Sequence, residues 1–166
     1  MRVLGIDPGT RQTGWGIIEK HQRGLKGIAA GIIKAESKLN LEKRLQIIFR
    51  GVGEVIETHK PDQIAIEDMF FSHRYVQGAL KLGHARGVIL LAAAEHNLEV
   101  SAYSPALVKR SIAGNGQAQK DQVARMVESI LGLKKLPHPD ATDALAIALT
   151  HLSKIQLSSR ERKIVA

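Results

Sequence analysis

Residues 2–16, which read RVLGIDPGTRQTGWG, decide the fold of this chain. Their apolar run, residues 3–6, ends on an acid, Asp7, and Pro8 and Gly9 follow. A short apolar run closed by Pro-Gly is typical of a buried strand that leaves the core. Asp7 would then lie at the mouth of a sheet, where sites gather in folds with parallel strands. Asp-Pro-Gly is also favourable turn chemistry, so a role for Asp7 depends on other acids reaching it.

The composition indicates a single globular domain. The chain has 166 residues, of which 44% are hydrophobic and 24% are charged, enough for a substantial core. We predict one domain over residues 1–153 and a basic, flexible tail over residues 154–166. The absence of Cys excludes disulfide scaffolds, thiolate catalysis and Cys-type zinc sites. We see no signal peptide and no run long enough to span a bilayer, so we expect a cytoplasmic protein without a membrane partner.

The charge indicates a polyanionic partner. The formal net charge is +8, and the pI is near 9.9. Nucleic acid is the first candidate for such a partner, and an anionic membrane surface is the second. A soluble basic protein without such a partner stays an alternative, because charge alone does not specify a function.

The first half of the chain predicts a sheet with both strand directions. Residues 13–19 and 27–35 form an antiparallel pair with a turn at Arg23 and Gly24, and the first strand joins them. Residues 41–59 have apolar side chains at helical spacing, with Asn40 as the N-cap, and the helix ends at Lys60. Residues 63–67 form another short strand, again ending on an acid. Strand, helix and strand in this order predict a right-handed parallel crossover, which brings Glu67 near Asp7.

The second half predicts mostly helices. Residues 77–96 read as a helix so apolar around its circumference that it must be buried on more than one side, either within one subunit or against a second copy. A strand over residues 98–103 follows. Three more helices are predicted: 105–112 behind an N-cap at Ser104, 120–131 ending at Gly132, and 140–153.

Acids stand at three places that this arrangement brings together. Besides Asp7 and Glu67, the last helix carries Asp140 and Asp143 on one face near its start. Capping of the helix alone explains this pair too. If all of them converge, a divalent cation must offset their repulsion. Oxygen-only ligation favours Mg²⁺, or Mn²⁺ in its place, and two ions in such a site suit phosphodiester hydrolysis.

Five stretches in order resemble the RuvC family of Holliday junction resolvases. These crossover junction endodeoxyribonucleases have a ribonuclease H-like fold. The matching stretches are GIDPGTRQTGWG (5–16), IAIEDMFF (64–71), ALKLGHARGV (79–88), VKRSIAGNGQAQKDQV (108–123) and DATDALAIALTH (140–151). DPGT alone also occurs in actin-like ATPases and sugar kinases, whereas the five together are specific.

The resemblance implies a fold, an activity and partners. The fold is α/β, a five-stranded mixed sheet with three antiparallel and two parallel strands, flanked by helices. The activity is Mg²⁺-dependent hydrolysis that resolves four-way junctions by paired symmetric nicks during recombination and repair. The enzyme would be a homodimer that works with a branch-migration helicase complex. The residues implied to bind metal and catalyse the reaction are Asp7, Glu67, Asp140 and Asp143.

The resemblance also implies residues that face DNA. Lys109 and Lys120 match basic positions beside the scissile phosphate, where lysine stabilises charge in the transition state. Phe70 and Phe71 suit base stacking and local unpairing. Burial in the core is the alternative, above all for Phe71, and the resemblance makes Phe70 the better candidate for stacking. Further phosphate contacts are expected from Arg74, Lys81, Arg86 and Arg110.

Two other functions compete with a junction endonuclease. DPGT also suits an actin-like ATPase or sugar kinase. Such enzymes bind a nucleotide between two domains, whereas this chain is long enough for only one domain. A non-catalytic nucleic-acid-binding module accounts for the net charge of +8. It leaves the convergent acids unexplained, because acids beside a DNA groove repel DNA unless a metal intervenes.

Overall fold

The computed structural model describes residues 1–22, 24–68, 76–134 and 138–165. The sheet consists of β1 (Arg2–Asp7), β2 (Gln12–His21), β3 (Gly24–Lys34), β4 (Gln63–Glu67) and β5 (Val100–Tyr103). The helices in these residues are α1 (Leu41–His59), α2 (Val76–Glu95), α3 (Pro105–Ala113), α4 (Lys120–Leu131) and α5 (Pro139–Val165).

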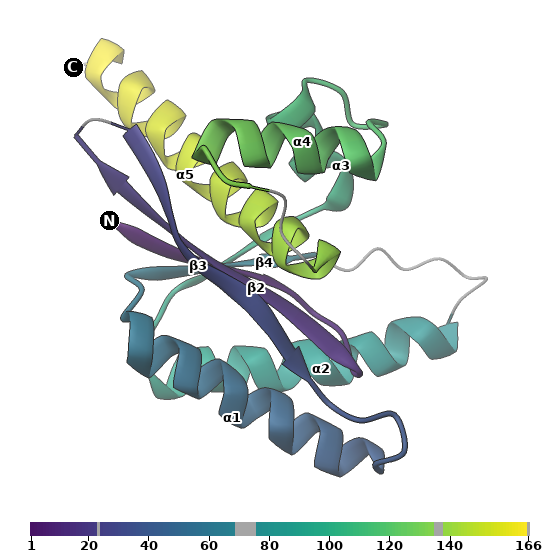
Figure 1. Cartoon of the computed structure of the whole chain (residues 1–166). Helices are drawn as coiled ribbons and strands as arrows, with labels where there is room; N and C mark the ends of the chain where they lie inside the picture. The colour runs from purple at the N-terminus through teal and green to yellow at the C-terminus, as the bar shows by residue number, and fades with distance from the viewer. Residues whose placement is uncertain (23, 69–75, 135–137, 166) are drawn as a thin grey trace.

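The sheet has the strand order β3-β2-β1-β4-β5. β1 pairs antiparallel with β2 and β2 with β3, whereas β1, β4 and β5 run parallel. This confirms the predicted mixed sheet. In Figure 1, α1 and α2 cover one face of the sheet and α5 crosses the other, with α3 and α4 packed on α5. The carboxyl ends of β1 and β4 lie side by side because these two strands are parallel neighbours in the sheet.

Alternating side chains of β1 build the core on both sides of the sheet. Leu4 and Ile6 belong to the cluster that faces α1 and α2, and Val3 belongs to the cluster formed with α3, α4 and α5. All three are fully buried. Asp7 continues this alternation, so its side chain lies on the α5 side of the sheet.

Glycines on the α5 side of β1 and β2 let the helix backbone rest on the strands. A Cβ atom at Gly5 would lie 1.9 Å from the carbonyl oxygen of Ala144, and one at Gly14 would lie 2.0 Å from that of Asp140. No side chain fits in either place. The start of α5 is therefore positioned by backbone contact, which fixes its acids relative to Asp7.

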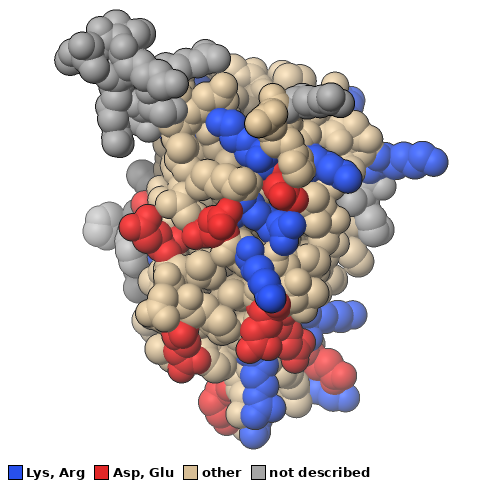
Figure 2. All heavy atoms as spheres, turned by 90° about the vertical axis from the view of Figure 1, so that its left-hand side faces the viewer, with Lys and Arg blue, Asp and Glu red and all other residues tan. Residues whose placement is uncertain are grey.

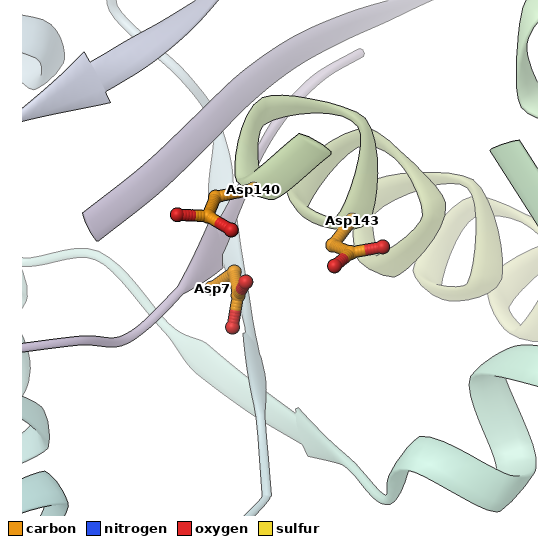
Figure 3. A group of neighbouring side chains, drawn as sticks. All are labelled: Asp7, Asp140 and Asp143. Carbon is orange, nitrogen blue, oxygen red and sulfur yellow. The ribbon is translucent and has the colours of Figure 1, made fainter. Parts of the chain in front are cut away.

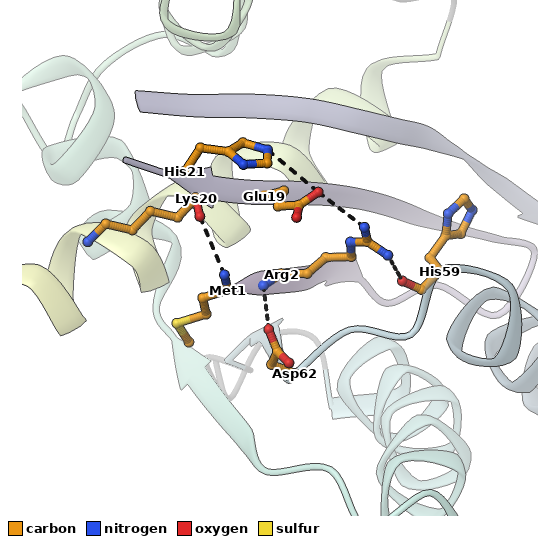
Figure 4. A network of polar contacts seen from close by, with 7 residues as sticks. All are labelled: Met1, Arg2, Glu19, Lys20, His21, His59 and Asp62. Atoms are coloured by element: carbon orange, nitrogen blue, oxygen red, sulfur yellow. Dashed lines mark hydrogen bonds and ion pairs between the residues drawn. The ribbon is translucent and has the colours of Figure 1, made fainter. Parts of the chain in front are cut away.

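The opposite end of β1 is held by Arg2 (Figure 4). Its guanidinium donates to the carbonyl oxygen of His59 and lies 3.1 Å from the carboxylate of Glu19, and its backbone N–H donates to Asp62 at 2.6 Å. The hydrogen bond from Arg2 lowers the pKa of Glu19.

Figure 2 shows a face on which Lys and Arg alternate with Asp and Glu, so the net positive charge is not concentrated on it.

Most predicted helix ends agree with the structure. The hydroxyl of Ser104 accepts a hydrogen bond from the N–H of Leu107 at 3.3 Å, which caps α3. α1 begins after Asn40, although the side chain of Asn40 makes no capping hydrogen bond. α1 ends where Lys60 turns left-handed at φ 46°, and α4 ends at Gly132.

The predicted end of the last helix, residue 153, is wrong. α5 continues to Val165. Residues 154–165 contain neither Gly nor Pro, so nothing stops a helix that is already nucleated on the core. The division of the chain at residue 153 stays a prediction. Among the described helices, none has the length and apolarity needed to cross a bilayer.

Candidate active site

Four acids reach one end of the sheet from three elements. Asp7 is the last residue of β1 and Glu67 the last of β4, whereas Asp140 and Asp143 come from the start of α5. Figure 3 shows the side chains of Asp7, Asp140 and Asp143 converging. One oxygen from each of these three lies within 4.8 Å of the others. Glu67 lines the same pocket of about 200 Å³ as Asp7 and Asp143. The predicted convergence of the acids is confirmed.

The loop after Asp7 is held by hydrogen bonds. The buried Thr13 hydroxyl donates to the carbonyl oxygen of Gly9 at 2.8 Å. From α1, the guanidinium of Arg44 donates to the carbonyl and hydroxyl oxygens of Thr10, both at 3.3 Å. The end of β1 thus has a defined path, which keeps Asp7 at the pocket. Sequence reasoning assigned no role to Thr13 or Arg44.

The acids destabilise one another's charge. Burial, followed by the charges of Glu67, Asp143 and Asp140, raises the pKa of Asp7 from 3.8 to about 8, although Lys120 acts in the opposite direction. Burial and the charge of Asp143 also raise the pKa of Glu67. The positive charge of Lys120 does not offset these effects, since the pKa of Asp7 is still raised. Clustered carboxylate oxygens without thiolates form the donor set of a hard divalent cation, so these residues fit Mg²⁺ or Mn²⁺.

Two lysines border the acids, at the predicted positions. The Lys120 ammonium lies 3.0 Å from Asp143, and this hydrogen bond raises the pKa of Lys120. Lys109 lines the same pocket, and its charge opposes the rise in the pKa of Glu67. The pocket is therefore lined by both carboxylates and ammonium groups.

Of the other predicted DNA-facing residues, those that the structure describes do not line this pocket. Lys81 on α2 and Arg110 on α3 are exposed and do not line the pocket. Phe70, Phe71 and Arg74 fall outside the residues that the structure describes.

Arg86 reaches the end of β4 from α2. Its Nη1 donates to the carbonyl oxygen of Glu67 at 2.6 Å, and its Nη2 lies 3.6 Å from the carboxylate of Asp68. Its side chain is 19% exposed. In this conformation the guanidinium supports the strand that carries Glu67. The sequence shows no signal for this contact, because it depends on how α2 packs.

α2 has apolar residues on both its inner and its outer face. Ala85 and Ile89 are fully buried against the sheet. Leu80 and Leu91, by contrast, are 62% and 53% exposed. Burial within one subunit therefore does not account for the unusually apolar composition of this helix.

Comparison with known proteins identifies the family. The sequence profile of the crossover junction endodeoxyribonuclease RuvC matches residues 3–151. The chain belongs to the RuvC family. It is 48% identical to RuvC of Sorangium cellulosum over 153 residues, which cover 92% of this chain and 85% of that protein. It is 44% identical to RuvC of Geobacter sulfurreducens over 164 residues, 99% of each chain.

Solved structures agree with this RuvC assignment. T. thermophilus RuvC in complex with Holliday junction substrate superimposes with a TM-score of 0.87 at 39% identity, covering 95% of this chain and 96% of that one. The yeast mitochondrial resolvase Ydc2 has a TM-score of 0.64 at 12% identity, so it shares the fold alone. The predicted family, its ribonuclease H-like fold and the endodeoxyribonuclease class are confirmed. RuvC membership favours a nuclease over the kinase and the non-catalytic module.

Proposed function

We propose that this chain resolves four-way DNA junctions by metal-dependent phosphodiester hydrolysis at the acidic pocket. One observation carries the proposal: in a RuvC-family chain, oxygens of Asp7, Asp140 and Asp143 lie within 4.8 Å of one another, in a pocket edged by Lys109 and Lys120. A polyanion held over an acidic pocket requires cations inside it, and this pocket provides both ligands for a cation and ammonium groups for a phosphate.

The residues proposed to hold the metal are Asp7, Glu67, Asp140 and Asp143. Mg²⁺ is the expected ion, with Mn²⁺ as a substitute, and two ions per site suit a cluster of four carboxylates. When bound, such ions polarise the phosphate and lower the pKa of the attacking water. The raised pKa of Asp7 supports this assignment, because a nearby cation offsets the two effects that raise it, burial first and then the repulsion between the acids.

The lysines act on the phosphate. The Lys120 side chain is 77% exposed and bonds to Asp143 at its tip. A long, exposed side chain can exchange this partner for a DNA phosphate when a cation takes over the charge of Asp143. Lys109, beside Glu67, stabilises the negative charge that develops on the phosphate during hydrolysis.

The DNA surface extends beyond the pocket. Phe70 and Phe71, which follow the strand of Glu67 in sequence, are proposed to stack on bases near the junction centre, with Phe70 contributing most. Further phosphate contacts are proposed for Arg74, Lys81 and Arg110.

A homodimer would present two such pockets to the junction. The exposed Leu80, Leu90 and Leu91 of α2 support pairing of this helix across a two-fold axis. Two related pockets would then nick symmetric strands. We also propose, from the family, that the dimer works with a branch-migration helicase complex in the cytoplasm.

Cleavage of a synthetic four-way junction tests the proposal. With Mg²⁺, the wild type should give paired symmetric nicks. Asp7→Asn should abolish nicking and keep junction binding, because it removes a metal ligand and leaves the basic surface intact. Glu54→Gln, an exposed acid on α1, is the matched control and should nick normally. Binding without nicking by the wild type, in either Mg²⁺ or Mn²⁺, would contradict the proposal.

A further inference from the structure

We propose that Gln12 is a positioning residue that orients Asp140 for metal binding, an inference that rests on the function proposed above. The side-chain amide Nε2 of Gln12 donates to Oδ2 of Asp140 at 2.6 Å, across 128 positions of sequence. None of the sequence patterns assigned Gln12 a role, because its contact with Asp140 depends on how α5 packs against the sheet.

The start of β2 fixes both the backbone and the side chain of Asp140. Gln12 is the first residue of β2 and pairs with Lys34 of β3. Two residues later, Gly14 leaves no room between the strand and the carbonyl oxygen of Asp140. With its backbone held at Gly14, Asp140 retains the rotation of its carboxylate as its main freedom, and the amide of Gln12 restricts that rotation.

The hydrogen bond engages Oδ2 of Asp140, and the carboxylate has a second oxygen that can bind a metal. In Figure 3, one oxygen of Asp140 points toward Asp7, and an oxygen of Asp140 lies within 4.8 Å of oxygens of Asp7 and Asp143. A partner outside the coordination shell that sets the orientation of a ligand is a common feature of metal sites.

The neutrality of this donor distinguishes Asp140 from Asp143. Asp143 is bonded to an ammonium, that of Lys120 at 3.0 Å, and this cation competes with a metal for the carboxylate. The amide of Gln12 donates without adding charge, so it does not compete with a cation for Asp140 as an ammonium would. A metal would then bind Asp140 without displacing a partner, whereas binding to Asp143 requires the release of Lys120.

Calorimetric titration of the metal-free protein with Mn²⁺, without DNA, tests this role. Gln12→Leu keeps the size of the side chain and removes the donor, and we expect it to weaken Mn²⁺ binding about 10-fold. Gln12→Thr, a good strand former too short to reach Asp140, should weaken binding to the same extent. Lys34→Gln alters the neighbouring strand position away from Asp140 and should bind Mn²⁺ as the wild type does.

A double-mutant cycle separates positioning from a general structural effect. In an Asp140→Asn background, Gln12→Leu should cause no further loss of Mn²⁺ affinity, because its target is already gone. A further 10-fold loss there would overturn the proposal, as would unchanged affinity in the single Gln12 variants. Asp143→Asn tests the metal site itself: if the wild type and this variant both fail to bind Mn²⁺, the proposed function fails and Gln12 loses its role with it.

Discussion

Replacing Asp7 by Asn should stabilise the metal-free protein, and the gain should grow with pH. The pKa of Asp7 is raised from 3.8 to about 8, by burial first and then by the neighbouring acids. In the unfolded chain the carboxyl ionises near pH 4, whereas the folded chain resists ionisation until about pH 8. Asp7 therefore costs the fold no stability below its unfolded pKa. This cost grows as pH rises from the unfolded pKa toward the folded pKa. Asparagine has nearly the same shape and never ionises.

The size of the effect follows from the two pKa values. Each pKa unit corresponds to about 1.4 kcal/mol, so a difference of about 4 units sets a ceiling of about 6 kcal/mol above pH 8 and about 4 kcal/mol at pH 7. Water entering the pocket and rotation of the neighbouring acids reduce this cost. We expect Asp7→Asn to raise the free energy of unfolding by about 2–4 kcal/mol at pH 8 and by about 1 kcal/mol or less at pH 4.5.

Urea unfolding in the presence of a chelator, from pH 4.5 to pH 8.5, measures this difference. Added Mg²⁺ should stabilise the wild type more than Asp7→Asn, because it binds the folded wild-type site. The reasoning is refuted if the two proteins have equal stability at pH 8, or if their difference does not change with pH.

Four further predictions concern stability and assembly. Gly5→Ala should destabilise the fold by about 3 kcal/mol or more in urea unfolding, since its Cβ would lie 1.9 Å from the carbonyl oxygen of Ala144. Gly53→Ala in α1, whose Cβ would meet only His96 at 3.8 Å, should stabilise by about 0.5–1 kcal/mol, and the opposite order of the two would contradict the packing described. Leu91→Glu should shift sedimentation from dimer to monomer, whereas Met126→Glu on α4, also exposed, should leave it unchanged; a monomeric wild type would rule out the proposed homodimer. Burial lowers the pKa of His151 from 6.5. Below pH 6.5 the unfolded chain therefore binds a proton that the folded chain does not bind. The free energy of unfolding falls as pH decreases through this range. His151→Gln should flatten this part of the pH profile of unfolding, and an unchanged slope would count against it.

The sequence predicted the framework of the site well because its signals are local. Asp7 and Glu67 each end a short apolar run, and the helix between the two runs makes the strands parallel neighbours. Asp140 and Asp143 stand three residues apart at the start of a helix. These patterns depend on neighbours in sequence, so they can be read without a structure.

The contacts that support the site could not be predicted, because they join distant segments. Gln12 contacts Asp140 only because α5 packs on the side of β1 and β2 where Gly5 and Gly14 leave room for its backbone. The bond from Arg86 to the carbonyl oxygen of Glu67 depends on the rotation of α2 about its axis. The end of α5 was misjudged for a different reason: its last residues carry no stop signal, and polar composition alone does not end a helix.

The position of α5 in the chain has a consequence for biosynthesis. Asp7 lies in β1, which leaves the ribosome before α5, the helix that carries Asp140 and Asp143. Domains are synthesised from the amino end, and contacts between distant segments form late. Until α5 settles on β1 and β2, a nascent chain holds only half of the acidic cluster. The complete acidic pocket therefore cannot form on a chain whose α5 has not yet been made.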